Sequence, residues 1–421
     1  MHDIKFIREN PELVKTGASS KNDTCDVDQI LSLDEQRREI IRRVERLKAE
    51  RNRVSDDIAK MRKAGEPADD AVAAMRKVGQ EISSLDARLR EIEAELNTAL
   101  AWVPNIPHES VPIGKDETAN VVVREWGEIT QPDFKVLPHW ETGEKLGILD
   151  LAAASRVSGS GFYLLRGMGA ALQRALINYM MDLHTADGFT EVSAPHMVTS
   201  DTMFGTGQLP KLSDDMYKTE EGTMYLIPTA EVPLTNIYRQ QIISHDQLPI
   251  RMVAHSPCYR REAGAAGKDT RGMIRVHQFD KVELVKIVRP ESSYEELESL
   301  VVQAEKVLQG LQLPYRVCEL ASGELSFASA KCFDLELWAA GVEKYLEISS
   351  VSNFEDFQAR RMNCRFRDEE GRVRFPHTLN GSGVALARLI PAILENYQNA
   401  DGSVTIPEVL KTYMQGAELI R

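Results

Sequence analysis

Residues 258–283 read CYRREAGAAGKDTRGMIRVHQFDKVE, and this stretch decides how the rest of the chain is interpreted. Its closing part is rich in β-branched residues, and a loop of small residues and cations precedes it. We expect 252–261 and 274–288 to form two strands that pair in the antiparallel sense across this loop.

One face of this predicted hairpin carries charged and aromatic side chains where a core would be apolar. Residues an even number apart share a face of a strand, which places Arg260 with Glu262. The same rule places Arg275, Phe279 and Glu283 together. Guanidinium groups bind phosphate, a ring stacks on a base and a carboxylate accepts from an amine, so this face suits a nucleotide. The alternative is a solvated face whose surface ion pairs contribute little to stability.

The order of these residues resembles the second signature motif of class II aminoacyl-tRNA synthetases. The motif stands here as Tyr259, Arg260, Arg261 and Glu262, followed after the loop by Arg275, Phe279 and Glu283. The run REAGAAGKDTRGMIRVHQFDKVE is similar, more narrowly, to the seryl-tRNA synthetase family. The resemblance implies ATP-dependent attachment of L-serine to tRNA(Ser) through a seryl-adenylate, with Mg²⁺ and with tRNA(Sec) left open as a second acceptor. Activation of an amino acid for a carrier protein and a non-catalytic tRNA-binding paralogue are the alternatives.

Length and composition limit the classes of protein that fit. A chain of 421 residues has room for two or three domains. Its net charge of −13 argues against indiscriminate binding of nucleic acid, so such a site must be a local basic patch. The five cysteines are scattered without CxxC spacing, which predicts reduced thiols, a cytoplasmic location and no zinc. The chain has no apolar run as long as a membrane span, and we expect no membrane partner.

Residues 33–98 carry the pattern of a long antiparallel helical hairpin. Apolar residues step by three and four over 40–61 and again over 75–96, and a Gly-Glu-Pro turn at 65–67 separates the two runs. Residues 37–63 hold eleven Lys or Arg and five Asp or Glu, a local charge of +6, while the remainder of the chain carries −19. A solvated coiled-coil face is the alternative, but a basic arm in an otherwise acidic protein favours phosphate contact. In the family this arm grips tRNA, which implies contacts by Arg42, Arg43, Arg46, Arg53 and Lys60.

Three prolines within residues 101–115 mark a domain boundary. We expect an N-terminal tRNA-binding domain over 1–103 and a class II catalytic domain over 104–421. After residue 121, short apolar strands and amphipathic helices follow each other without regular β-α-β order. This pattern predicts an α+β fold on an antiparallel sheet, preceded by the coiled-coil arm.

The segment 169–195 is an interface or core element by its pattern. Apolar residues over 172–183 lie on one helical face, and 189–195 would continue as a strand. GFTEVSAP in this segment resembles the first class II motif, which implies a homodimer through 169–195.

Two more segments resemble the family's sites for amino acid and phosphate. In MYLIPTAEVPLTN, Thr229 and Glu231 would share a strand face, and the resemblance implies that they bind the serine ammonium. In HTLNGSGVALARL, the glycines around Ser382 would form a turn before a helix that carries Arg388. This segment resembles the third class II motif, and a turn of this kind is weak evidence for anion binding.

The segment EISS at 347–350 resembles the family's metal and ATP segment, in which an acidic residue and a serine hold Mg²⁺. These match Glu347 and Ser350. Strict alternation would pair Glu347 with Ser349, so the assignment requires the strand to end or bulge here. An ion pair of Glu347 with a nearby arginine such as Arg360 is the alternative.

By resemblance, Arg260, Arg388 and Glu283 are expected to act in catalysis, and Glu283 to read the serine hydroxyl with Ser382. The implied serine site comprises Thr229, Glu231, Arg260, Glu283 and Ser382. The implied ATP site comprises Arg260, Glu262, Arg271, Phe279, Glu347, Ile348, Ser349, Ser350 and Arg388.

Overall fold

The computed structural model describes residues 1–263 and 271–421. Most of the small-residue loop expected between the two motif strands falls at 264–270, outside the described residues. Among the helices in the described ranges, none combines the length and the apolar character needed to span a membrane. All five cysteines are free thiols.

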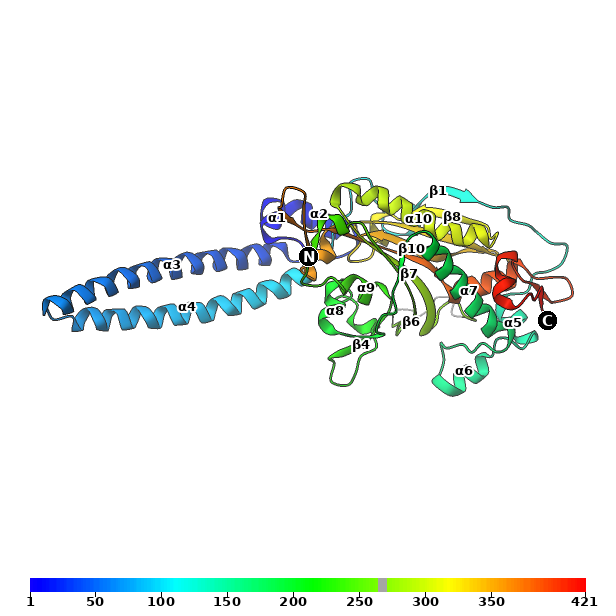
Figure 1. Cartoon of the computed structure of the whole chain (residues 1–421), viewed down its shortest axis with the longest axis horizontal. Helices are drawn as coiled ribbons and strands as arrows, with labels where there is room; N and C mark the ends of the chain where they lie inside the picture. Colours follow the sequence, from blue (N-terminus) through cyan, green and yellow to red (C-terminus); the bar gives the residue numbers. More distant parts are fainter. Residues whose placement is uncertain (264–270) are drawn as a thin grey trace. The chain divides into compact units, whose positions relative to one another are not determined.

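The chain divides into two compact units, and the first, residues 1–19 and 23–104, is helical. α1 (Ile4–Glu9) and α2 (Pro11–Ser20) precede α3 (Val27–Ala64) and α4 (Asp69–Ala101), which run side by side in opposite directions (Figure 1). The side chain of Asp26 caps α3 by accepting from the backbone N of Gln29 at 2.8 Å. Gly65 ends the helix with a φ of 74°, a conformation that costs glycine little. The long helical hairpin is confirmed, although α3 begins at Val27 and not near residue 33.

Apolar contacts and ion pairs join the two long helices. Val44 of α3 and Ile82, Ile92 and Leu96 of α4 are buried along the predicted seam. Three ion pairs cross between the helices: Arg37–Glu93 at 3.1 Å, Arg43–Glu81 at 2.5 Å and Lys48–Asp86 at 3.8 Å. Part of the basic charge of α3 is therefore matched by acidic residues of α4.

The second unit, residues 20–22 and 105–421, is built on an eight-stranded sheet. In spatial order its strands are β1 (Val121–Trp126), β8 (Tyr315–Glu319), β9 (Lys331–Ala339), β10 (Lys344–Asn353), β13 (His377–Ala385), β7 (Gln278–Val288), β6 (Ile250–Tyr259) and β2 (Thr190–Glu191). All neighbours pair in the antiparallel sense except β2 and β6, which are parallel. The expected antiparallel α+β fold is confirmed.

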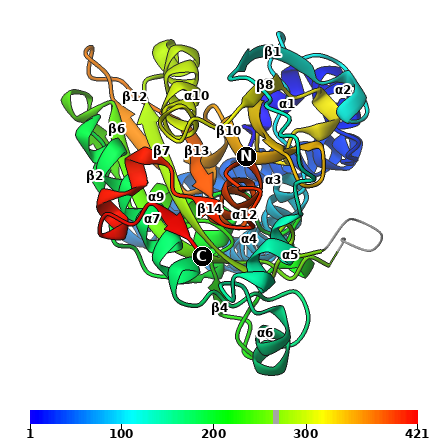
Figure 2. The same ribbon diagram turned by 90° about the vertical axis from the view of Figure 1, so that its right-hand side faces the viewer.

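Three helices, α7 (Met168–Ala186), α10 (Ser293–Gly310) and α12 (Leu386–Asn396), pack with one face of this sheet in a single core (Figure 2). Alternation along β7 shows the two faces: Val282 and Leu284 lie in that core, while Phe279 and Lys281 line a cavity. The apolar side chains of α7, among them Leu172, therefore pack in the hydrophobic core of the second unit.

The central hairpin of β6 and β7 is confirmed, with Cys258 opposite Phe279 and Ala254 opposite Glu283. β6 has the expected length but lies two residues earlier, from Ile250 to Tyr259, and β7 is shorter than expected because it begins at Gln278. The strand expected over 189–195 is also shorter, because β2 comprises only two residues.

Shorter elements complete the second unit. The helices are α5 (His139–Lys145), α6 (Leu151–Ser158), α8 (Ser200–Gly205), α9 (Glu231–Asn236) and α11 (Phe357–Arg361). The strands are β3 (Met197–Thr199), β4 (Met224–Leu226), β5 (Ile242–Ser244), β11 (Arg365–Arg367), β12 (Val373–Arg374), β14 (Val404–Thr405) and β15 (Leu419–Ile420).

Candidate active site

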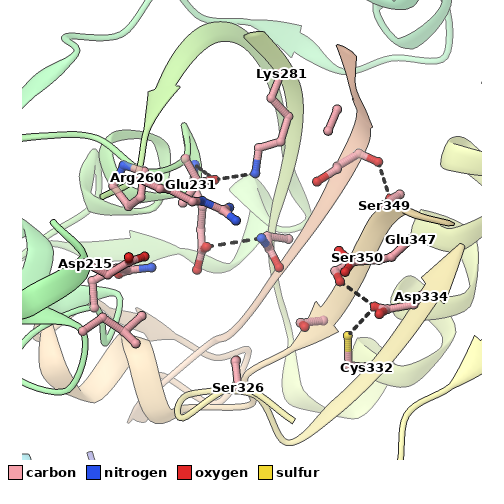
Figure 3. Close-up of a pocket in the computed structure, with 18 of the residues that line it drawn as sticks. Asp215, Glu231, Arg260, Lys281, Ser326, Cys332, Asp334, Glu347, Ser349 and Ser350 are labelled. Atoms are coloured by element: carbon pink, nitrogen blue, oxygen red, sulfur yellow. Dashed lines mark hydrogen bonds between the residues drawn. The ribbon is translucent and has the colours of Figure 1, made fainter. Parts of the chain in front are cut away.

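A cavity of about 440 Å³ is lined by side chains of β7, β9, β10 and β13 (Figure 3). The chain before α9 and the first turn of α12 also contribute to its wall. The expected site residues that line it are Thr229, Glu231, Arg260, Glu262, Phe279, Glu347, Ile348, Ser349, Ser350, Ser382 and Arg388. Of the expected site residues that the structure describes, Glu283 and Arg271 do not line the cavity.

Thr229 and Glu231 do not share a strand face, which corrects the sequence interpretation. Glu231 is the first residue of α9, and Thr229 lies in the bend before it. The Thr229 hydroxyl accepts from the backbone N of Glu231 at 3.2 Å, a bond that favours a helix start over an extended strand. Glu231 accepts from Gln358 Nε2 at 2.7 Å and from Asn380 Nδ2 at 3.2 Å. Both expected residues thus reach the cavity, but from a helix start.

The carboxyl group of Glu231 is costly to ionise in the free protein. Burial, and next the neighbouring carboxylate of Glu283, raise the pKa of Glu231 to about 7. Gln358, Lys281 and Arg260 act in the opposite direction and lower this pKa. A bound ammonium group would favour the ionised form, so Glu231 is suited to bind an amine.

Glu283 lies behind the cavity wall and is paired there. Its side chain is completely buried, and its Oε2 lies 2.6 Å from the Nζ of Lys281. Its Oε1 accepts from Asn380 Nδ2 at 2.8 Å. Lys281 also donates to Thr229 Oγ1 at 3.0 Å. One amide group, that of Asn380, therefore bridges the carboxylates of Glu231 and Glu283.

Of the four second-motif residues that line the cavity, Arg260, Glu262 and Arg275 lie outside the strands, which corrects their expected strand faces, whereas Phe279 lies in β7 on the face it was expected to share with Glu283. Arg260 and Glu262 lie beyond the end of β6, and Arg275 lies before β7. Glu262 has a φ of 52°, so the backbone leaves the extended conformation and the alternation of faces stops. Glu262 forms an ion pair with Arg275, and the guanidinium carbon of Arg260 lies 5.2 Å from the centre of the Phe279 ring. Two guanidinium groups, a carboxylate and a ring are thus collected in one place.

β10 bulges after Glu347 in its pairing with β9, as the assignment of two metal ligands required. Glu347 and Ser350 consequently both line the cavity. Arg388 forms an ion pair with the Glu347 carboxylate at 3.3 Å and donates to its backbone carbonyl. The alternative partner Arg360 pairs with Asp356 at 2.7 Å.

Asp334 of β9 adds a second carboxylate beside Glu347. Its Oδ1 accepts from Ser350 Oγ at 2.5 Å. Burial, and next the charge of Glu347, raise the pKa of Asp334 well above its usual range. Carboxylates and hydroxyls are the ligands that Mg²⁺ prefers, so the donor set of Glu347, Ser350 and Asp334 fits this ion. The described residues, these included, hold no group of three or more His, Cys, Asp or Glu side chains suited to a metal; this set combines two carboxylates with a hydroxyl.

The Gly-Ser-Gly sequence at 381–383 lies inside β13, and the expected turn before α12 is wrong. A Cβ atom on Gly383 would lie 2.8 Å from His184 Nε2, and one on Gly381 would lie 3.1 Å from Leu300. These neighbours belong to α7 and α10, so the glycines allow the two helices to pack closely on the sheet. Ser382 lines the cavity.

A buried His-Glu pair holds the segment where the described chain resumes after residue 270. His139 Nε2 accepts from the backbone N of Met273 at 3.1 Å, and its Nδ1 therefore donates to Glu395 Oε1 at 2.9 Å. Glu395 also accepts from the backbone N of His139 and of Gly341, each at 2.9 Å. Arg271, two residues before Met273, is exposed.

The cations expected to contact tRNA lie on α3. Arg42, Arg46 and Arg53 are exposed. Arg43 pairs with Glu81, as described above, and Lys60 lies 3.5 Å from a carboxylate oxygen of Asp57. The charges of Arg42, Arg46 and Arg53 are therefore more available to an external phosphate than those of Arg43 and Lys60.

Sequence reasoning missed several polar residues of the cavity lining, among them Lys281, Asp334 and Asn380. It also missed Gln358, which donates to Glu231. Lys281 could have been found, because it lies two residues from both Phe279 and Glu283 and therefore shares their strand face. Asp334 and Gln358 come from β9 and α11, where no motif was recognised. Only tertiary contacts reveal their place.

A mostly antiparallel sheet with helices on one face, and a cavity that joins residues of the second and third signature motifs, define a class II aminoacyl-tRNA synthetase core. Residues 215–397 match the family model of the tRNA synthetase class II core domain (G, H, P, S and T), and residues 1–107 match that of the seryl-tRNA synthetase N-terminal domain. The chain belongs to the seryl-tRNA synthetase family.

Full-length relatives support this assignment. The serine–tRNA ligase of Caldicellulosiruptor saccharolyticus is 57% identical, and that of Thermodesulfovibrio yellowstonii is 54% identical, each over 100% of both chains. Among solved structures, seryl-tRNA synthetase from Pyrococcus horikoshii complexed with ATP matches with a TM-score of 0.94 and 41% identity, over 100% of this chain and 99% of that one.

Proposed function

We propose that the chain attaches L-serine to tRNA(Ser) in two steps. The serine carboxylate attacks the α-phosphorus of ATP, which forms seryl-adenylate and releases pyrophosphate. The 3′-terminal hydroxyl of the tRNA then attacks the carbonyl carbon and releases AMP. The observation that carries this proposal is one cavity that contains a buried carboxylate for an amine, Glu231, and guanidinium groups for phosphates, Arg260 and Arg388.

The first step needs positioning and charge stabilisation, because the attacking carboxylate is already a nucleophile. We assign Arg260 to the α-phosphate and the serine carboxylate, and Arg388 to the outer phosphates. Mg²⁺, held by Glu347 and Ser350, would neutralise phosphate charge when bound. Asp334, bonded to Ser350, would orient that hydroxyl.

The adenine base is assigned to the ring of Phe279, with Arg388 on its other face and Glu262 near its amine. Arg260 lies over the same ring in the free protein, so ATP binding would move its guanidinium towards phosphate. Arg271 is assigned to a phosphate or to the tRNA acceptor end.

Serine is assigned to the part of the cavity around Glu231. Glu231 binds the ammonium group. The Thr229 oxygen already accepts from Glu231 N and Lys281 Nζ, so its hydroxyl is placed to donate, which suits the serine carboxylate. Glu283 and Ser382 are assigned to the serine hydroxyl. A site built for a hydroxyl rejects alanine, because its buried polar groups would lose their partner.

The remaining assignments concern the whole protein. Residues 1–103 would bind tRNA through the basic face of α3, and residues 104–421 would carry the chemistry. Two copies would associate through 169–195, and the protein would act in the cytoplasm. tRNA(Sec) is a second acceptor to be tested beside tRNA(Ser).

Serine-dependent exchange of pyrophosphate into ATP tests the proposal, with alanine, threonine, glycine and cysteine in parallel. We expect strong exchange with serine alone, followed by charging of tRNA(Ser). Exchange with a different amino acid would point to the carrier-protein alternative, and no exchange with any of them would point to a non-catalytic tRNA-binding protein.

A further inference from the structure

The ammonium group of Lys281 stands between the cavity and the residue expected to read the serine hydroxyl. Lys281 lines the cavity, whereas Glu283, two residues along β7, lies behind the wall. The side chains are 6% and 0% exposed, so neither charge is screened by bulk water.

The known contacts of Lys281 leave it able to bind a ligand. Its Nζ lies 2.6 Å from Glu283 Oε2 and donates to Thr229 Oγ1 at 3.0 Å. An ammonium group has three N–H donors, and the hydrogen bond to the Thr229 hydroxyl commits one of them, while Glu283 Oε2 has no hydrogen-bond partner in the described chain. A remaining donor of Lys281 can donate to a ligand oxygen in the cavity, while a hydroxyl hydrogen donates towards Glu283.

The balance of charges around Lys281 also favours binding of a ligand hydroxyl at this residue. Glu231 and Glu283 are two buried carboxylates joined by the amide of Asn380, and Lys281 supplies one positive charge between them. When both carboxylates are ionised, these three side chains are one positive charge short of neutral, and a substrate ammonium at Glu231 would supply it. Because Lys281 neutralises Glu283, the ammonium is directed to Glu231 and the hydroxyl to the Lys281–Glu283 pair.

We propose that Lys281 is a specificity-determining residue, whose ammonium donates to the substrate hydroxyl oxygen and holds Glu283 ready to accept the hydroxyl hydrogen. This inference rests on the proposed activation of serine. It predicts that an amino acid without a side-chain hydroxyl leaves both a buried donor and a buried acceptor without a partner.

Two stable analogues of the adenylate provide the test: 5′-O-(N-seryl)sulfamoyl adenosine and its alanyl counterpart, which differ only by the hydroxyl. Their dissociation constants are measured by calorimetry on the full chain, unaltered and with Lys281→Met. Lys281→Gln is measured as well, because it keeps an N–H donor in the buried position. We expect Lys281→Met to weaken the seryl compound about 10- to 100-fold and the alanyl compound less than about 3-fold.

Lys286→Met is the matched control. Lys286 is also a buried lysine of β7 with an ion pair, at 2.7 Å to Glu296, but in the described chain it is not part of the cavity lining. Its replacement should leave the ratio of the two dissociation constants unchanged. An equal loss for both compounds in Lys281→Met would overturn the proposal, because a purely structural role affects both. Failure of the unaltered protein to bind either compound would overturn the proposed function itself.

Discussion

At the scale of single residues, the ammonium site proposed at Glu231 depends on the protonation state of its carboxyl group. Its pKa of about 7 reflects burial first and the charge of Glu283 second. Below this pH the carboxyl is neutral and cannot balance an ammonium, and above it the carboxylate is ionised. We therefore predict that kcat/KM for serine, measured by pyrophosphate exchange at saturating ATP, rises as the pH increases through about 7.

Glu231→Gln is the control for this prediction. It keeps a hydrogen-bonding group but has no titrating proton, so its kcat/KM should be about 100-fold lower and lack the rise. A glutamine variant that keeps the rise would assign the pH dependence to a different group.

A replacement of Gly383 can distinguish two interpretations of the Gly-Ser-Gly sequence at 381–383, an anion-binding turn and a closely packed strand. If this glycine served an anion-binding turn, Gly383→Ala would raise KM for ATP. In the structure it lies in β13, and an added Cβ would press on His184, which is buried. We predict a loss of about 1–3 kcal/mol in the free energy of unfolding in urea, with KM for ATP unchanged. A stable variant with weakened ATP binding would restore the turn interpretation.

At the scale of elements, one carboxylate joins three segments of the catalytic unit. Glu395 of α12 accepts from His139 of α5 and from the backbone of Gly341, and His139 in turn accepts from Met273. Glu395→Ala would leave several buried donors without an acceptor. We predict a loss of about 3 kcal/mol in the free energy of unfolding, measured by urea titration followed by circular dichroism.

Glu408→Ala is the matched control for Glu395→Ala. Glu408 also pairs with a cation, Lys411, at 2.7 Å, but its side chain is 84% exposed. Its removal should change the stability by less than about 0.5 kcal/mol. Equal effects of the two replacements would show that the buried network contributes nothing beyond a surface pair.

Helices and strands were predicted well from the sequence where an apolar pattern repeats over many residues. They were predicted poorly where a single contact determines the local backbone conformation. The seam of α3 and α4 repeats over many turns, and the β6–β7 hairpin follows from its residue types and loop. The register shift after Glu347 meets the condition set by the sequence analysis, that the strand must end or bulge there if Glu347 and Ser350 are to share a face. The left-handed backbone of Glu262 and the helix start at Glu231 could not be read from alternation, since each depends on one local bond or ion pair. The glycines of β13 depend on His184 and Leu300, which lie far away in sequence.

At the scale of the whole molecule, the lining of the cavity and the basic helix belong to different units. Every described residue of the cavity lining lies between 206 and 388. Residues 20–22 nevertheless belong to the catalytic unit. The ammonium of Lys21 is buried and donates to the backbone carbonyls of Asn105, Phe327 and Ser329 at 3.2, 3.1 and 2.8 Å, and Phe327 lines the cavity.

This arrangement predicts different results for two deletions. Replacing residues 36–98 by a short glycine linker removes most of α3 and α4 but keeps Lys21, so serine-dependent pyrophosphate exchange should stay within about 3-fold of the full chain. Charging of tRNA(Ser) should be lost, because the basic face proposed to bind the tRNA phosphates is gone. Deleting residues 1–98 also removes Lys21 and leaves three buried carbonyls without their donor, so exchange should fall as well and Lys21→Met should reproduce part of that fall. Loss of exchange in the 36–98 deletion, with its circular dichroism showing a folded sheet, would contradict the assignment of tRNA binding to residues 1–103 and of the chemistry to residues 104–421.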